Sequence, residues 1–326
     1  MNDASAIYTV SILIVTLVAG LLYIRLWRAR APDRTPTGFG ALLAFVALGG
    51  GVAAGASASK ILALAALCLG TIVYWIDDAV ELPARARMII AMLIGMVVGG
   101  LLIVDSGSPS LASWIAICLA AGATCVILTN VVNFYDGADL NLALYIAMTC
   151  ALVLLFRPEA SSWTPIASAC LAFVLPFAAL NSRPRTIYLG DGGSFAFAGL
   201  LTAIGTAFVL APSSVPPEAA IPSALPALDV AYVFAVRVAS GHDLLSRNWL
   251  HLYQQLNLRW RGFGYLAPQL VNVALCVVVS SGLQQLGLEK LTAIIWAGAL
   301  VTISFYFACR ALFVPNESVI DPTAGE

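Results

Sequence analysis

The sequence is poor in charged residues. Only 10% of its 326 residues are Asp, Glu, Lys or Arg, against about 25% in a typical soluble domain. With a formal net charge of −1, it lacks the basic surface that nucleic-acid binding requires, so nucleic acid is excluded as a partner. It has only two histidines and neither a GxGxxG nor a GxxxxGK(S/T) nucleotide loop. Its seven cysteines form no CxxC pair and are interpreted as small apolar residues.

Apolar residues dominate instead, at 61% of the chain with a mean hydropathy of +0.94. Because one bilayer crossing takes about 20 apolar residues, the sequence predicts an all-α polytopic integral membrane protein that forms a single domain, residues 1–326. Hydropathy and turn signals predict eleven transmembrane helices, the first of them retained rather than cleaved as a signal peptide. They lie near residues 6–27, 38–56, 61–76, 88–104, 111–129, 141–156, 164–181, 195–211, 222–240, 265–283 and 291–309.

Lys and Arg segregate between alternate loops. One set of loops and span ends holds thirteen of them: Arg25, Arg28, Arg30, Arg34, Arg85, Arg87, Arg183, Arg185, Arg237, Arg247, Arg259, Arg261 and Arg310. The other set holds only Lys60, Arg157 and Lys290. By the positive-inside rule, this asymmetry predicts an N-terminus outside and a C-terminus in the cytoplasm.

Three segments on the predicted cytoplasmic side carry acids. They are the pair that ends at Asp78, an NxxNxxDGxD run from Asn130 to Asp139, and a GDGGS run from Gly190 to Ser194. A single acid in a loop is usually no more than a solvated side chain, but carboxylates gathered on one face repel each other unless a cation lies among them. Magnesium usually takes one or two protein carboxylates and fills its other positions with water and phosphate. The pattern therefore predicts a magnesium site that handles phosphate.

Both histidines, His242 and His251, fall in the longest cytoplasmic loop, Gly241–Gly264. A lone loop histidine is usually solvated, but basic groups that face an acidic metal site suit an anionic diphosphate. The same loop contains Arg247, Arg259 and Arg261. Asp229 lies inside the ninth predicted span, where we expect it to pair with a basic group, either Arg237 or one on a neighbouring helix.

These segments resemble the polyprenyl-phosphate N-acetylhexosamine-1-phosphate transferases, a glycosyltransferase family 4-like group, over roughly Pro32 to Leu256. The stretch DDxxxLxxxxR from Asp77 to Arg87 is similar to the aspartate-pair motif of that family. The NxxNxxDGxD run is a second motif, and NSRP from Asn181 leading into GDGGS is similar to a third, Nxx-P…GDxGS.

Two further segments extend the resemblance. PALD ending at Asp229, followed by Arg237, is similar to a PxxD…R pattern. HLYQQL from His251 resembles the histidine motif in the form used by the O-antigen-initiating branch.

The chain departs from the family pattern at several positions. Tyr253 and Gln254 replace two histidines, Ala91 stands where a glutamine often occurs, and Leu140-Asn141 interrupts the usual DGxDGLA. RTPTG from Arg34 is a shortened form of a PTPRGGG-like signature.

The resemblance implies a reaction: transfer of N-acetylhexosamine 1-phosphate from a UDP-sugar to undecaprenyl phosphate, with release of UMP, at the cytoplasmic face of a bacterial inner membrane. This step initiates O-antigen, lipopolysaccharide or other cell-envelope glycans. The implied cofactor is Mg²⁺, with Mn²⁺ as the alternative ion, and a homodimer is left open.

The resemblance also assigns roles. Asp77, Asp78 and Asp191 are the implied catalytic residues, with Asp78 and Asp191 as magnesium ligands and Asp77 assisting the metal or orienting the lipid phosphate. The implied substrate-binding residues are Arg87, Asn130, Asn133, Asp136, Asp139, Asn181 and His251. The sugar, GlcNAc, GalNAc, QuiNAc or FucNAc, is left open, and we expect the Gly241–Gly264 loop to select it.

Three other readings remain open. A secondary transporter also contains membrane acids, but it predicts polar groups near the bilayer midplane. A polytopic scaffold with a decayed site would explain the missing histidines and glutamine. A CDP-alcohol type of phosphotransferase would use magnesium too, but it carries its acids in one helical motif.

Overall fold

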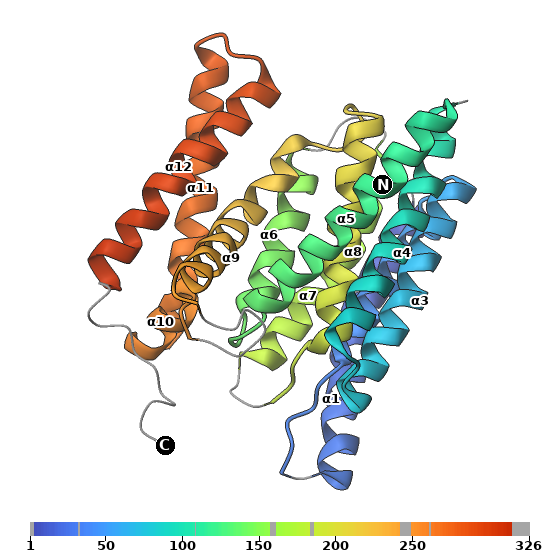
Figure 1. The fold of residues 1–326 in the computed structure, drawn as a ribbon. Helices are drawn as coiled ribbons and strands as arrows, with labels where there is room; N and C mark the ends of the chain where they lie inside the picture. The colour runs from blue at the N-terminus through green and yellow to red at the C-terminus, as the bar shows by residue number, and fades with distance from the viewer. Residues whose placement is uncertain are drawn as a thin grey trace. The chain divides into compact units, whose positions relative to one another are not determined.

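The computed structural model describes residues 3–31, 33–107, 109–156, 161–182, 186–241, 249–260 and 262–314, and the regular elements in these ranges are all helices (Figure 1). They form two compact units, an N-terminal unit, Met1–Ala219, and a C-terminal unit, Ala220–Glu326, each of which is described by itself. Several residues named above lie outside the described ranges: Pro32, Arg157, Arg183, Pro184, Arg185, His242, Arg247 and Arg261.

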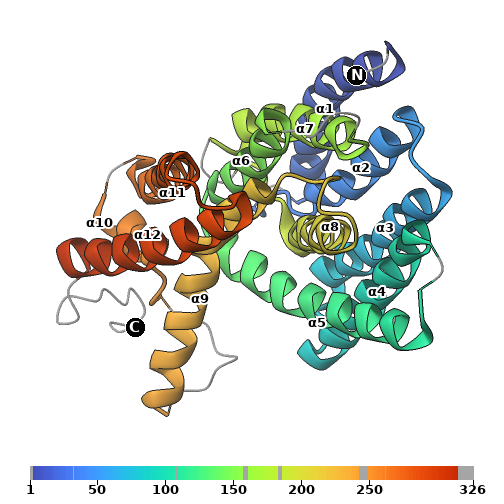
Figure 2. The same cartoon turned by 90° about the horizontal axis from the view of Figure 1, so that it is seen from above.

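The N-terminal unit is built around one buried helix, α8. Its helices are α1 (Asp3–Arg30), α2 (Leu42–Ala53), α3 (Ala58–Val80), α4 (Ala84–Leu102), α5 (Leu111–Tyr135), α6 (Asn141–Leu155), α7 (Trp163–Asn181) and α8 (Gly190–Leu210), with 3-10 turns η1 (Phe39–Ala41) and η2 (Ile103–Ser106). Helix α8 contacts α2, α3, α4, α5 and η1, and Figure 2 shows it inside their ring. Its sequence suits this place, because nearly every residue from Gly192 to Ala203 is apolar or small.

The C-terminal unit is smaller. It contains α9 (Ile221–Ala239), α10 (Leu252–Arg259), the 3-10 turn η4 (Gly264–Leu266), α11 (Ala267–Gln285) and α12 (Lys290–Phe313), while η3 (Pro217–Ala220) ends where this unit begins. Helix α9 packs against α11 and α12, which also pack against each other.

Nine helices within the described ranges are long and apolar enough to cross a membrane, and two more, Phe39–Ala53 and Asn141–Leu155, are apolar but shorter. The chain is therefore a polytopic membrane-embedded protein. The two shorter helices coincide with the predicted spans 38–56 and 141–156. The count of eleven crossings and the orientation stay predictions.

Two expectations are wrong: that Asp77, Asp78 and Asp191 lie in loops outside the predicted spans 61–76 and 195–211, and that Gly241–Gly264 is one long loop. Asp77 and Asp78 lie in the last turn of α3, and Asp191 lies in the first turn of α8, because both helices continue beyond their apolar runs. The stretch expected to be one long loop, Gly241–Gly264, contains helix α10.

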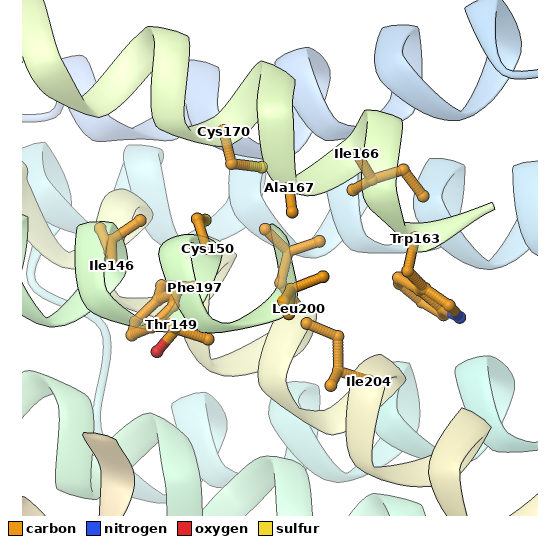
Figure 3. A pocket seen from close by; sticks show the side chains of 11 residues that line it. Ile146, Thr149, Cys150, Trp163, Ile166, Ala167, Cys170, Phe197, Leu200 and Ile204 are labelled. Atoms are coloured by element: carbon orange, nitrogen blue, oxygen red, sulfur yellow. The ribbon is translucent and has the colours of Figure 1, made fainter. Parts of the chain in front are cut away.

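A small cavity lies in the core of the N-terminal unit, between α6, α7 and α8 (Figure 3). Its volume is about 20 Å³, and apolar side chains such as Trp163, Ile166 and Phe197 line it. Since this is about the room that one water molecule needs, the cavity is a packing gap rather than a ligand site.

Leu140 generates the first prediction. It has φ +64° at the start of α6, a left-handed conformation that costs a non-glycine residue about 1–2 kcal/mol. Glycine adopts it without that penalty but loses about 0.5–1 kcal/mol of chain entropy on folding. We expect Leu140→Gly to raise the free energy of unfolding by about 1 kcal/mol relative to Leu140→Ala, measured by thermal unfolding in detergent. The alanine variant loses the same side-chain packing but keeps the strain, so equal stabilities would contradict the prediction.

Candidate active site

The ends of α3 and α8 meet through two aspartates. The backbone N–H of Asp191 donates to Asp78 Oδ1 at 3.0 Å, so the two residues are neighbours although 113 positions separate them in the chain. The other oxygen, Asp78 Oδ2, is buried and has no hydrogen-bond partner among the residues that the structure describes. An unpartnered buried carboxylate oxygen is costly, and this atom is therefore a candidate ligand for a cation.

Arg87, in the first turn of α4, joins the same cluster. Its Nη1 lies 3.2 Å from Asp191 Oδ2 and 3.4 Å from Asp77 Oδ2. Asp77 is buried, and its Oδ1 accepts the Leu82 N–H at 2.5 Å. The Arg87 side chain is 34% exposed, so its guanidinium is open to solvent on one side. Three carboxylates and one guanidinium leave an excess of negative charge, which favours binding of a cation.

Close backbone packing brings a fourth segment to this cluster. The Tyr188 N–H donates to Pro36 O at 2.8 Å, and the Gly40 N–H donates to Leu189 O at 3.0 Å. Gly190 has φ +78°, and a Cβ on it would lie only 2.7 Å from Asp78 Oδ2 and 2.6 Å from the Gly38 backbone nitrogen. Glycine at 190 is thus required both by its conformation and by the closeness of Asp78.

Tyr74 of α3 connects the acidic cluster to the apolar core. Its hydroxyl donates to the Arg87 carbonyl at 2.7 Å, and its ring stacks on Phe195 with centroids 4.3 Å apart. Ala91 packs into this apolar group and is fully buried. The position where a glutamine was expected therefore supplies core packing and no polar group.

The NxxNxxDGxD segment is hydrogen-bonded to α8 through Asp136. Asp136, the residue that directly follows α5, accepts a hydrogen bond from Ser194 Oγ at 3.1 Å. Asn130 and Asn133 lie on the exposed side of α5, and Asn130 Nδ2 donates to Val126 O at 2.8 Å. Asp139 is partly exposed, and burial raises its pKa.

Asn181 is buried, and its side chain holds the backbone. Its Oδ1 accepts the Leu140 N–H at 2.5 Å, and its Nδ2 donates to Ile187 O at 2.7 Å. The amide therefore ties the start of α6 to the segment that leads into α8. It shapes the acidic site through these backbone contacts, and its predicted direct contact with substrate stays a prediction.

A two-carboxylate site fits magnesium. Within the described ranges, no group of three His, Cys, Asp or Glu residues is arranged to hold a metal ion. Mg²⁺, however, commonly uses only one or two carboxylates together with water and substrate phosphate. Asp78, with its unpartnered oxygen, and the adjacent Asp191 match that donor set.

An apolar pocket of about 600 Å³ borders this site. Residues of α1, η1, α2 and α3 line it, among them Ala19, Leu22, Phe45 and Ile72. It reaches Gly38 and Trp75, and a Cβ on Gly38 would lie 3.3 Å from Asp78 Oδ2. One end of the pocket is thus next to the carboxylate pair.

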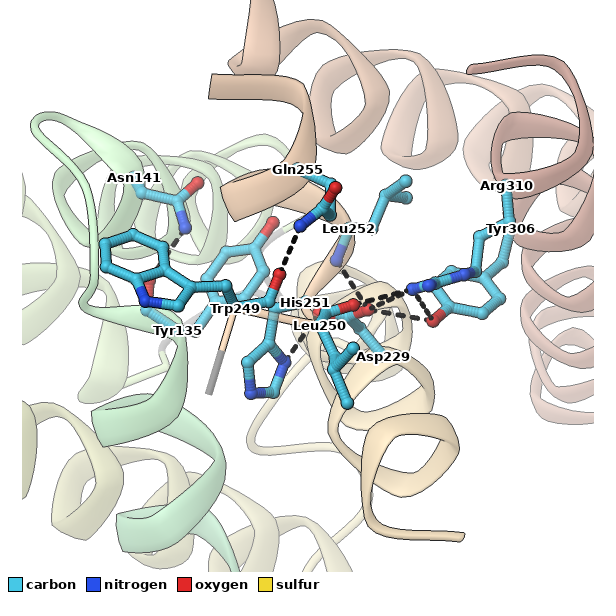
Figure 4. A network of polar contacts seen from close by, with 10 residues as sticks. All are labelled: Tyr135, Asn141, Asp229, Trp249, Leu250, His251, Leu252, Gln255, Tyr306 and Arg310. Atoms are coloured by element: carbon cyan, nitrogen blue, oxygen red, sulfur yellow. Dashed lines mark hydrogen bonds and ion pairs between the residues drawn. The ribbon is translucent and has the colours of Figure 1, made fainter. Parts of the chain in front are cut away.

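The C-terminal unit contains a separate polar network around Asp229 of α9 (Figure 4). Asp229 is buried, and its Oδ2 lies 3.0 Å from His251 Nδ1. Tyr306 Oη donates to Asp229 Oδ1 at 2.8 Å, and Arg310 Nη1 is 3.9 Å away. The expectation of a basic partner on a neighbouring helix is met by Arg310 of α12, and His251 is an additional partner.

Tyr253, which replaces a histidine of the family pattern, is buried with its ring 5.9 Å from that of His251. It packs against the imidazole. Sequence reasoning did not find Tyr74, Tyr306 or Arg310 as contributors, because a tyrosine or arginine within an apolar span carries no motif.

Asp136 generates a pH-dependent prediction. Burial raises the pKa of its carboxyl to about 8, against about 3.9 in an unfolded chain. The protonated form therefore stabilises the fold fully below about pH 4, and this stabilisation is lost as the pH rises to about 8. The Asp136→Asn variant cannot ionise at this position. We therefore expect its thermal stability, relative to that of the natural protein, to increase as the pH rises from 5 to about 8 and to stay constant above that pH. Asp33→Asn, at an exposed position, is the control, and a pH-independent difference at Asp136 would refute the assignment.

The comparisons with known proteins give one family match, and it covers the segment that contains the aspartate cluster. The model of the family described as "Glycosyl transferase family 4" matches residues 60–209, a range that contains all the predicted site residues except His251. No curated protein matches the chain. The match supports a transferase function, and over residues 60–209 the chain is similar to the glycosyltransferase family 4 proteins.

Proposed function

We propose that this protein transfers N-acetylhexosamine 1-phosphate from a UDP-sugar to undecaprenyl phosphate and releases UMP. The observation that supports this most directly is the meeting of Asp77, Asp78 and Asp191 with Arg87 at two helix ends, inside the matched range 60–209. The reaction exchanges one diphosphate bond for another, so catalysis must mainly bring two anions together and balance the charge on the transferred phosphoryl group.

Each charged residue has a part in this proposal. The partly exposed guanidinium of Arg87 binds a phosphate oxygen, and its contacts with Asp77 and Asp191 fix its position. Asp77, buried and bonded to the Leu82 N–H, orients Arg87. A phosphate monoester is already largely a dianion at neutral pH, so the acceptor needs no strong base.

The metal and the nucleotide complete the proposal. Asp78 and Asp191 would hold Mg²⁺ or Mn²⁺. Either ion, when bound, would neutralise negative charge on the diphosphate. Asn130, Asn133, Asp136 and Asp139 would bind the nucleotide, and His251 would receive phosphate charge. We place the reaction at the cytoplasmic face of a bacterial inner membrane, in the initiation of O-antigen or another envelope glycan.

The apolar pocket between α1, α2 and α3 suits a lipid substrate. Its lining is apolar, and its end at Gly38 and Trp75 borders the carboxylates. An isoprenoid chain in the pocket would leave its phosphate at this end. A purely water-soluble acceptor would have no use for such a pocket.

A secondary transporter is the alternative from another class. One observation favours it: Asp229 is buried within α9, away from the helix ends. The acids of the N-terminal unit, in contrast, lie at helix ends, as a boundary site requires. Release of UMP from a UDP-sugar distinguishes the transferase from these alternatives, since neither a transporter nor a scaffold would produce UMP.

The first test is the reaction itself. Purified protein in detergent, with undecaprenyl phosphate, Mg²⁺ and a panel of UDP-N-acetylhexosamines, is expected to release UMP with at least one sugar. Asp78→Asn and Asp191→Asn are expected to lower the rate about 100-fold or more, because each removes a carboxylate that would hold the Mg²⁺ that balances the charge of the transition state. The matched control is Glu81→Gln, a neighbouring acid that is exposed. Absence of UMP with every sugar, or unchanged rates in the aspartate variants, would contradict the proposal.

The second test fills the apolar pocket. Ala19 lines the pocket, whereas its neighbour Val18 is exposed on the same helix. We expect Ala19→Trp to raise the KM for undecaprenyl phosphate about tenfold, because the indole occupies volume that the lipid chain needs. Val18→Trp, with the same bulk on another face, should leave this KM unchanged. An equal KM in both variants would mean that the acceptor chain lies elsewhere.

A further inference from the structure

The buried carboxylate of Asp229 is surrounded by donors from separate elements of the C-terminal unit. Its Oδ1 accepts the Leu252 N–H at 3.0 Å and the Tyr306 hydroxyl at 2.8 Å, while its Oδ2 faces His251 Nδ1 at 3.0 Å (Figure 4). A buried carboxylate is stable only when it is paired in this way. Its orientation is fixed because both oxygens are engaged.

Arg310 links the same network to the backbone next to His251. Its Nη1 donates to Leu250 O at 2.9 Å and to Tyr306 Oη at 3.2 Å. Its guanidinium carbon also lies 4.5 Å from the centre of the Tyr232 ring on α9, within the range of a cation–π contact. One side chain of α12 thus contacts α9, Tyr306 and the segment that carries His251.

These contacts determine the state of the His251 ring. A carboxylate accepts hydrogen bonds but cannot donate them, so Nδ1 of His251 must carry a proton toward Asp229. The partner of one ring nitrogen decides which tautomer is present and how the ring points. Whatever holds Asp229 in place therefore holds His251 in the Nδ1–H form.

We propose that Tyr306 and Arg310 of α12 are positioning residues that act through Asp229 to set the tautomer and orientation of His251. Neither residue belongs to the matched range 60–209. The catalytic consequence rests on the proposed function, in which His251 receives phosphate charge. The positioning itself is a property of the C-terminal unit and is measurable without substrate.

The low number of histidines makes a direct measurement simple. The full chain has only two, so protein labelled with ¹⁵N-histidine gives two sets of ring signals, and His242→Gln assigns them. We expect the Nδ1–H tautomer to predominate at His251 in the natural protein. Tyr306→Phe keeps the ring but removes the hydroxyl, and we expect the ratio of Nδ1–H to Nε2–H to fall about fivefold, as for loss of one hydrogen bond.

Arg310→Gln is the second variant, with the same expected direction, and it covers the case in which one of the two fails to fold. Tyr232→Phe is the matched control, because it keeps the ring under Arg310 and leaves the three contacts to Asp229 in place. An unchanged tautomer ratio in the folded Tyr306 and Arg310 variants would overturn the proposal, as would an equal change in Tyr232→Phe.

Rates of UMP release provide the second readout. We expect Tyr306→Phe to lower kcat about tenfold in the natural background, as for loss of a hydrogen bond to a charged group. In a His251→Gln background it should lower kcat less than about twofold, because residues that act through one another are not additive. Equal losses in both backgrounds would indicate a merely structural role. If the natural protein releases no UMP, the proposed function fails, while the tautomer ratio still decides the positioning.

Discussion

The N-terminal unit depends on a carboxylate in an unfavourable place. Asp78 lies in the last turn of α3, where the helix dipole disfavours negative charge. The compensation is the N-terminus of α8, whose Asp191 N–H donates to Asp78 Oδ1, since the first amides of a helix have no partner within it. The C-terminus of one helix and the N-terminus of another are thus held together by the acid itself. The most buried helix of the unit begins at this contact.

The contact between Asp78 and Asp191 requires glycine at neighbouring positions. The Asp78 carboxylate reaches the α8 amide only because residue 190 has no side chain and a positive φ. The segment that leads into η1 also packs close to residue 190, and it forms hydrogen bonds with the backbone of Tyr188 and Leu189. The apolar pocket is lined in part by Gly38, where a Cβ would lie 3.3 Å from Asp78 Oδ2. A requirement for backbone closeness therefore links the acidic cluster, the α8 terminus and the apolar pocket.

The grouping of Asp77, Asp78 and Asp191 could be predicted because the spacing of the acids, and the repulsion between them, can be inferred from the sequence. Sequence reasoning placed them in loops, however, since hydropathy detects where a span stops being apolar and not where its hydrogen bonds end. It did not predict that the Asn181 side chain also binds two backbone groups. Such bonds depend on three-dimensional proximity of segments that no spacing rule connects. The same holds for Tyr306, whose partner lies 77 positions away.

Asp78 of α3, which is half-buried, and Asp229 of α9, which is buried, show how the hydrogen bonds that a carboxylate already accepts indicate its role. Both oxygens of Asp229 are engaged by protein groups, so it has little capacity left for a ligand and serves to orient its neighbours. Asp78 accepts a hydrogen bond from Asp191 with one oxygen, and within the described part of the chain its other oxygen is buried without a partner. Burial of that second oxygen destabilises the fold, because no hydrogen bond offsets the cost of its desolvation. A bound cation would offset this desolvation, and the proposed metal site therefore includes Asp78 and not Asp229.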